Sequence, residues 1–303
     1  MIFDKMDDCF RTLNEKVEKA IRDSDLKKLF WMLDEIEGPT LVCGVGGSSV
    51  VATYLAKVLR EKRHIITDFI SPRDLFYMDL TPYRNVIAVS YSGNNIGAEA
   101  ICHTGLNKYL FTGHPRDDVN NLVYRMPAEL SYVSISATLV PLSLLFLYYR
   151  NDHDLLKEIL DREISSASYN TSYEVMSGYE TQTAACILES SFIESGMASC
   201  IVHDKYNFCH GRINHSREAD SDLIFFKGNS ELDEMLEENL PNHFGRIITI
   251  EKEYEDDVIN DFYSALISMK LIRDIAQNRH RDISNIDELE DNDVFYLFNG
   301  KMK

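Results

Sequence analysis

Residues 86–100, VIAVSYSGNNIGAEA, join a short apolar run to a polar turn and then to an amphipathic stretch. The run Val86–Val89 predicts a buried strand, and a helix is expected over 95–105. The turn between them, Ser90–Asn95, carries two serine hydroxyls, a glycine and two amides. Backbone N–H groups at the start of a helix point outward, and the helix dipole favours an anion there. The stretch therefore predicts a turn that binds a phosphate group.

A second segment of the same kind lies upstream, in residues 40–50, TLVCGVGGSSV. A strand is expected over 40–44, then the glycine-rich turn Gly44–Ser49, then a helix over 48–61. The two turns are about as far apart as one strand–helix–strand unit requires. The first turn also partly matches the dinucleotide fingerprint, with Asp68 as its acidic residue, but Ser49 stands where that fingerprint has its third glycine. A nucleotide cofactor is therefore the weaker interpretation.

Short apolar strands alternate with helices along most of the chain, which predicts α/β architecture with parallel sheets. In the first half we expect helices over 3–36 and 133–149, and further strands over 64–69, 85–90, 108–112 and 122–126. In the second half we expect strands over 172–177, 198–203, 222–226 and 246–250, and helices over 180–195, 230–239 and 255–278. Residues 1–155 are predicted to form one domain with helices at its N-terminus, and residues 156–303 a second domain with a C-terminal helix and tail.

The composition narrows the range of functions. The chain has 303 residues and a formal net charge of −18, which argues against nucleic acid as a partner because a phosphate backbone requires a basic surface. Its six cysteines are scattered without a CxxC pair, which is typical of reduced thiols in a cytoplasmic protein. The apolar segment 132–149 contains three serines, a threonine and a proline, so we interpret it as a buried helix and expect no membrane partner.

The two turns together resemble the sugar isomerase (SIS) domain family, in which Ser-x-Ser-Gly-Asn follows a strand and a glycine-rich turn lies upstream. The resemblance covers about residues 35–280. It implies two three-layer α/β/α domains with parallel sheets, a phosphorylated sugar as ligand, no cofactor and a homodimer. It also implies that the sugar phosphate is bound by Gly46, Gly47, Ser48, Ser49, Ser90, Ser92, Gly93, Asn95 and Ser134. Asn95 stands where the family usually has threonine, and we expect it to cap the following helix.

The second half carries the expected chemistry. The resemblance implies a helix glutamate, Glu189, and a loop histidine, His210, within Asn207-Phe-Cys-His-Gly-Arg. Glu189 would act as the base that moves a proton between C1 and C2, His210 as the acid that opens the ring, and Arg212 would orient an oxyanion. Lys301 and Lys303 are considered because some members place a C-terminal lysine in the site.

Several functions stay open at this point. The residues favour an aldose–ketose phosphosugar isomerase or a related deglycase. The alternative is a non-catalytic sugar-phosphate sensor that keeps the phosphate turn without the chemistry. His210, His215, Glu218 and Asp220 form a cluster, but their spacing fits no closed zinc site, so no metal is expected.

Overall fold

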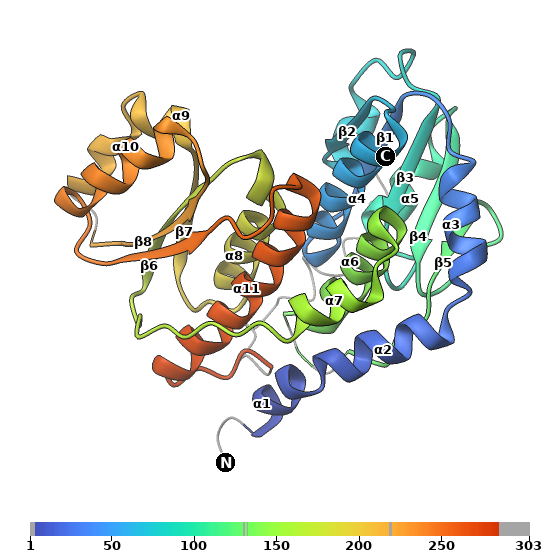
Figure 1. The fold of residues 1–303 in the computed structure, drawn as a ribbon. Helices are drawn as coiled ribbons and strands as arrows, with labels where there is room; N and C mark the ends of the chain where they lie inside the picture. The colour runs from blue at the N-terminus through green and yellow to red at the C-terminus, as the bar shows by residue number, and fades with distance from the viewer. Residues whose placement is uncertain (1–3, 130, 132, 218–219, 285–303) are drawn as a thin grey trace. The chain divides into compact units, whose positions relative to one another are not determined.

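The computed structural model describes residues 4–129, 131, 133–217 and 220–284. The chain divides into two compact units, each described here by itself (Figure 1). The first unit comprises Arg11–Leu156. The second comprises Lys157–Ser284 together with residues 4–10.

The first unit is built on a parallel five-stranded sheet with the strand order β2-β1-β3-β4-β5. The central strands β1 and β3 are buried along their whole length, as is typical of strands that helices cover on both faces, whereas β2 and β5 at the edges are more exposed. The strands are β1 (Thr40–Cys43), β2 (Thr67–Ile70), β3 (Asn85–Val89), β4 (Asn107–Thr112) and β5 (Asn120–Val123).

Helices cover both faces of this sheet. Helices α4 (Gly47–Arg63) and α6 (Ile135–Arg150) pack against each other, and α4 packs against β1, β2 and β3. On the other face, α5 (Ile96–Cys102) and the 3-10 helix η1 (Pro72–Phe76) close a core that includes Leu41, Val86 and Leu110. Helix α2 (Leu13–Asp23) lies against α6, and α3 (Leu26–Asp34) lies against β5.

The second unit contains a parallel four-stranded sheet with the order β7-β6-β8-β9. Its strands are β6 (Ser172–Ser177), β7 (Ser199–Asp204), β8 (Asp222–Lys227) and β9 (Ile247–Glu251). Helices α8 (Gln182–Glu194) and α11 (Asp257–Asn278) pack together. Helices α9 (Lys205–Cys209) and α10 (Glu231–Asn239) pack through Phe208 and Leu236 on a core that includes Met176.

Helices α8 and α9 cover opposite faces of the second sheet (Figure 1). The Tyr173 ring stacks on Phe192 of α8, with ring centroids 4.6 Å apart, whereas Met176 packs with Phe208 of α9. Side chains three residues apart on a strand point to opposite faces. Helix α1 (Asp4–Arg11) belongs to the second unit as far as Phe10, and Gln277 of α11 donates to Asp7 at 2.8 Å.

The strands expected from the sequence are all present within a few residues of the predicted bounds. The expectation that His210 and its neighbours form a loop was wrong in part, because α9 ends just before His210 and the 3-10 helix η3 (Arg212–Arg217) begins just after it. The Asp204 carboxylate caps α9 by accepting from the Asn207 N–H at 3.0 Å, and Phe208 buries one face of the turn.

The apolar segment 132–149 lies mostly within α6, whose residues from Leu139 to Tyr148 are all buried. Within the described part of the chain, no helix has the length and apolar character needed to cross a membrane. The two domains predicted over residues 1–155 and 156–303 stay a prediction. The two compact units of the structure meet in the sequence between Leu156 and Lys157.

Candidate functional site

The two turns predicted to bind phosphate follow neighbouring strands of the first sheet. Strands β1 and β3 are parallel neighbours, with Cys43 paired to Ala88 at their carboxyl ends. In the order β2-β1-β3-β4-β5, the chain passes from β1 to β2 on one side and then crosses back to continue with β3 on the other side of β1. The point between β1 and β3 is therefore a topological switch point. Open α/β sheets bind ligands in the crevice beyond the carboxyl ends of strands at such a switch point. The fold therefore places Gly44–Ser49 and Ser90–Asn95 together at the position where a ligand is expected.

The turn after β1 is shaped by close backbone approach. A Cβ atom at Gly44 would collide with the Ser48 carbonyl, and Gly46 has a φ of +56°, a conformation that favours glycine. Ser49 donates its hydroxyl to the Gly46 carbonyl at 2.7 Å. Gly46 is the N-cap residue of the 17-residue helix α4 and has no side chain to cap it. Backbone N–H groups in the first turn of α4 are therefore not capped by their N-cap residue.

The turn after β3 is held by its own side chains. Ser90 is buried and its hydroxyl oxygen accepts from the Gly93 N–H at 3.1 Å. Ser92 is exposed and donates to the Asn94 amide oxygen at 2.5 Å. Asn95 caps α5 as expected, because its amide oxygen accepts from the Ala98 N–H at 3.0 Å. Ser90 and Asn95 therefore shape the turn, and Ser92 is the serine of this turn that faces solvent.

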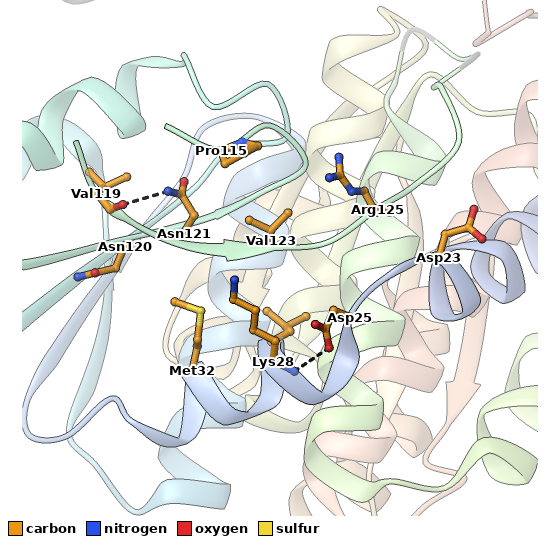
Figure 2. A pocket seen from close by; sticks show the side chains of 11 residues that line it. Asp23, Asp25, Lys28, Met32, Pro115, Val119, Asn120, Asn121, Val123 and Arg125 are labelled. Carbon is orange, nitrogen blue, oxygen red and sulfur yellow. Dashed lines mark hydrogen bonds between the residues drawn. The ribbon is translucent and has the colours of Figure 1, made fainter. Parts of the chain in front are cut away.

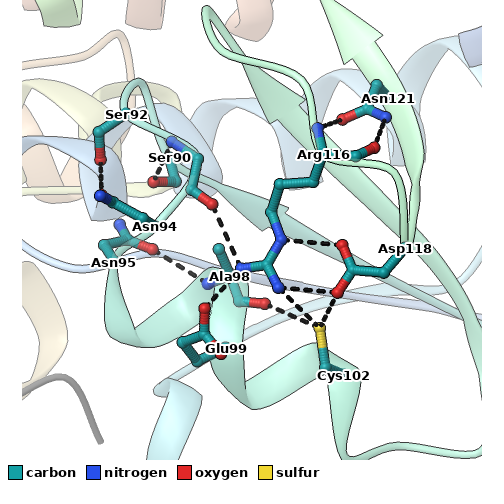
Figure 3. A network of polar contacts seen from close by, with 11 residues as sticks. Ser90, Ser92, Asn94, Asn95, Ala98, Glu99, Cys102, Arg116, Asp118 and Asn121 are labelled. Carbon is teal, nitrogen blue, oxygen red and sulfur yellow. Dashed lines mark hydrogen bonds and ion pairs between the residues drawn. The ribbon is translucent and has the colours of Figure 1, made fainter.

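Arg116 braces this turn from the loop that follows β4 (Figure 3). Its guanidinium donates to the Gly93 carbonyl at 3.4 Å and to the Glu99 carboxylate at 2.5 Å. It also forms two hydrogen bonds with Asp118, at 2.9 and 2.7 Å. Asn121 in turn accepts from the Arg116 N–H at 2.9 Å. Sequence reasoning missed Arg116, because its partners lie up to 23 residues away and no local motif marks it.

The start of α6 lies against the start of α4. A Cβ atom at Gly47 would come within 2.9 Å of the Thr138 hydroxyl and 3.6 Å of the Ser134 Cβ. The structure thus brings Ser134 to the glycine-rich turn. The Glu129 carboxylate accepts from the Ala137 N–H and the Ser136 hydroxyl, so an internal carboxylate already occupies the N-terminal end of α6.

The predicted catalytic residues lie on the second unit. Glu189 is exposed on α8, His210 is exposed and follows α9, and Arg212 donates to the Val202 carbonyl of β7 at 3.5 Å. Glu189 and His210 come from helices on opposite faces of the sheet, and no hydrogen bond joins them among the residues that the structure describes. Their shared role stays a prediction. Lys301 and Lys303 lie outside the described residues.

A buried carboxylate with two histidine partners was missed by the sequence analysis. Glu174, in the middle of β6, is fully buried, and its two oxygens lie 3.0 Å from His203 Nε2 and 3.1 Å from His215 Nδ1. Burial raises the pKa of Glu174, but the hydrogen bonds from both histidines outweigh it and the pKa is lowered. The sequence does contain one indication of this cluster: Glu174 is a single carboxylate within a strand expected to be buried, and a buried carboxylate requires partners.

The switch point of the second sheet is already occupied by charges of the chain itself. Lys205 is buried and donates to Asp233 at 2.6 Å and to Glu180 at 3.1 Å. The Asp233 carboxylate also accepts from the Ser230 N–H and lies where a Cβ atom at Gly228 would be. An internal carboxylate thus fills the place that corresponds to the turn after β3 of the first sheet. Among the described residues, no group of three or more His, Cys, Asp or Glu side chains is arranged to hold a metal ion.

Comparison with solved structures gives the class of fold. The chain has the fold of phosphosugar isomerase and SIS-domain structures, so the predicted resemblance is confirmed at the level of fold. Mixed α/β architecture with parallel sheets is confirmed with it. No family model and no curated protein matches the sequence.

Three solved structures illustrate the likeness. The C-terminal domain of glucosamine-fructose-6-phosphate aminotransferase from Francisella tularensis matches with a TM-score of 0.68 and 12% identity, over 93% of this chain and 97% of that one. Glucosamine-6-phosphate deaminase from Thermotoga maritima matches with a TM-score of 0.67 and 14% identity, over 92% and 98%. Tagatose-6-phosphate ketose/aldose isomerase from Escherichia coli matches with a TM-score of 0.67 and 15% identity, over 92% of each chain.

Proposed function

We propose that this chain binds a phosphorylated sugar at the turns that follow β1 and β3. We further propose that it is an aldose–ketose isomerase or a related deglycase. The observation that carries the proposal is the juxtaposition of Gly44–Ser49 and Ser90–Asn95 at the switch point of the first sheet. The three solved structures named above, a glucosamine-fructose-6-phosphate aminotransferase domain, a glucosamine-6-phosphate deaminase and a tagatose-6-phosphate ketose/aldose isomerase, share this fold.

The phosphate would be held by hydroxyl groups and by the start of α4. Among the described residues, the Ser48 and Ser134 hydroxyls have no hydrogen-bond partner, and both lie at the start of a helix whose N-cap residue makes no side-chain cap. The exposed Ser92 hydroxyl can turn from Asn94 towards a ligand. Hydrogen bonds to a charged group are about twice as strong as neutral ones, so three such donors can anchor a phosphate in water.

Isomerisation would proceed by proton transfer between neighbouring carbons. A carboxylate, assigned to Glu189, would take the C2 proton of the open-chain aldose to leave an enediolate and would return that proton to C1, while the hydroxyl proton passes from the C2 oxygen to the C1 oxygen to give the ketose. His210 would donate a proton to the ring oxygen during opening, and Arg212 would stabilise the oxyanion. In a deglycase, the same proton transfer would precede hydrolytic release of an amine.

A sugar-phosphate sensor is the second candidate. Two observations favour a sensor: the Glu189 side chain is exposed on α8, and α8 and α9, which carry Glu189 and lead to His210, cover opposite faces of the sheet. A sensor would keep the phosphate turns and show no turnover. The predicted homodimer, the two SIS-type domains and the cytoplasmic location are part of the same proposal.

A thermal-shift titration tests ligand binding. Fructose 6-phosphate, glucosamine 6-phosphate and ribose 5-phosphate are compared with unphosphorylated fructose. A ligand at one hundred times its Kd adds about 2.7 kcal/mol to the free energy of unfolding. We expect at least one phosphosugar, and not fructose, to raise the melting temperature. NAD serves as the probe for the dinucleotide alternative.

The same titration on variants locates the site. We expect the double variant Ser48→Ala/Ser92→Ala to weaken phosphosugar binding by roughly tenfold or more, because each lost hydrogen bond is to a charged group. Ser199→Ala is the matched control, since Ser199 is an exposed serine at the amino end of β7. If no phosphosugar stabilises the protein, or if the double variant binds as tightly as the wild type, the proposal fails.

A further inference from the structure

A pocket lies in the first unit, between α3 and the edge strand β5 (Figure 2). Its volume is about 670 Å³, within the range of small-molecule sites. None of its lining residues belongs to the turns that follow β1 and β3. The pocket is therefore separate from the proposed sugar-phosphate site and needs its own explanation.

Two cations face this pocket without partners. The Lys28 side chain extends from α3 towards β5, and Arg125 lies just beyond the end of β5 (Figure 2). Among the described residues, neither the Lys28 ammonium nor the Arg125 guanidinium forms a hydrogen bond or an ion pair. Both are exposed, so each can move to a ligand at the low cost of side-chain ordering.

The two carboxylates of the pocket are already engaged. Asp23 accepts from the Lys19 ammonium at 2.7 Å, and this hydrogen bond lowers the pKa of Asp23. Asp25 caps α3 by accepting from the Lys28 N–H at 3.0 Å. The charges of Lys28, Arg125, Asp23 and Asp25 sum to zero, but both carboxylates accept from donors of the chain whereas both cations are unengaged among the described residues. The charged groups that remain available to a ligand are both cations, and they favour an anion.

The rest of the lining is suited to a ligand with an apolar body. Leu29 and Met32 of α3 face the pocket together with Val123 of β5 and Pro115 from the preceding loop. Asn120 and Asn121 add amide groups along the same edge. The lining thus combines apolar and polar side chains, so it can contact both an apolar body and a charged head of one organic ligand.

We propose that the pocket between α3 and β5 binds a small organic anion. Lys28 and Arg125 would hold a carboxylate or phosphate head, and Met32, Leu29 and Val123 would contact an apolar body. An inorganic anion would contact only the two cations, and a neutral apolar molecule would contact only the apolar side chains. The inference does not depend on the proposed sugar-phosphate function.

Cyclohexanecarboxylate is the probe, because it joins a carboxylate to an apolar ring and does not absorb where tryptophan does. Trp31, the chain's single tryptophan, lies on α3 next to Met32 and outside the pocket lining, so its fluorescence is a secondary signal and calorimetry is the primary measurement. Binding is measured on the full chain by Trp31 fluorescence and by titration calorimetry. Cyclohexylmethanol is the neutral analogue, and inorganic phosphate is the anion without an apolar body.

We expect saturable binding of one cyclohexanecarboxylate per chain. We expect binding to weaken roughly tenfold or more for Lys28→Met and for Arg125→Met, because a charge-assisted contact is lost while the stem of the side chain stays. Lys27→Met, an exposed lysine of the same helix outside the pocket lining, is the matched control and should bind as the wild type does. Cyclohexylmethanol and inorganic phosphate should each bind at least about tenfold more weakly than the probe.

Val123→Trp is a second variant that fills the pocket while leaving both cations in place. It should abolish binding of the probe with the melting temperature close to that of the wild type. The proposal is overturned if the probe does not bind at millimolar concentration, if the neutral analogue binds equally well, or if Val123→Trp and both cation variants leave binding unchanged.

Discussion

His203 Nε2 lies 3.0 Å from the Glu174 carboxylate inside the second unit, where the exposed fractions of the two side chains are 4% and zero. The second oxygen of Glu174 is bonded to His215, whose side chain is 48% exposed. A buried carboxylate is stable only when such partners compensate for its lost hydration. This cluster therefore links the stability of the second sheet to pH.

The first prediction concerns acid stability. The folded pKa of Glu174 lies below its ordinary value of 4.5, so its contribution to stability is present above that value and is lost as pH falls through the folded pKa. We expect Glu174→Gln to lower the free energy of unfolding at pH 7 by about 1–3 kcal/mol. The gap between variant and wild type should shrink as pH is lowered below about 4.5. Urea unfolding at a series of pH values measures the difference in the free energy of unfolding between the two proteins. A difference that does not change with pH would contradict the prediction.

The second prediction concerns catalysis. If Glu189 is the base, Glu189→Gln should reduce exchange of the C2 proton of the phosphosugar with deuterated water by about 10²–10⁴-fold, with binding unchanged. Proton NMR in deuterated water measures the exchange. Glu194, five residues further along the same helix, is the comparison, because burial raises the pKa of its carboxyl group. Loss of exchange in Glu194→Gln alone would transfer the role to Glu194, and no exchange in the wild type would favour a sensor.

The third prediction concerns the turn after β3. Gly93 has a φ of +72°, and a Cβ atom there would collide with the His114 carbonyl oxygen. We expect Gly93→Ala to lower the free energy of unfolding by about 1–3 kcal/mol and to weaken phosphosugar binding. Gly105→Ala is the control, because a Cβ atom there meets no atom within 4 Å. Urea midpoints compare the two variants, and equal midpoints would show that the turn tolerates a side chain.

The fourth prediction concerns Arg116. Arg116→Met removes the donors to Gly93, Glu99 and Asp118, so the turn after β3 should lose its brace. We expect phosphosugar binding to weaken several-fold, while stability falls by only about 1 kcal/mol because the ion pairs are partly exposed. Lys108→Met on β4 is the control. Unchanged affinity in Arg116→Met would show that the turn holds its shape without the arginine.

The fifth prediction concerns Lys205. Lys205→Met leaves the carboxylates of Asp233 and Glu180 without their cation, which should lower the free energy of unfolding by about 3–5 kcal/mol. Adding Asp233→Asn should recover part of this loss, because one uncompensated charge is removed. Lys252→Met, which breaks the more exposed pair with Asp257, should cost under about 1 kcal/mol. Chemical denaturation of the three variants measures these differences.

Much of the fold could be predicted because parallel strands covered on both faces are continuous apolar runs. Val86–Val89 and Leu223–Phe226 are such runs, and both are strands. The segment 205–212 was misjudged because its polar residues are typical of a loop, whereas burial of Phe208 and the cap by Asp204 favour a helical turn. Capping by Asn95 was predictable, since it depends on neighbours three residues away.

By itself the sequence determined the order of strands and helices and the presence of two polar turns at strand ends, because periodicity and capping act between near neighbours. Only the tertiary structure decided that β1 lies next to β3, that Glu174 meets His203 and His215, and that Lys28 and Arg125 share a pocket. These relationships join residues tens of positions apart. They depend on which strands pair and which helix faces are buried, and local residue patterns do not encode that choice.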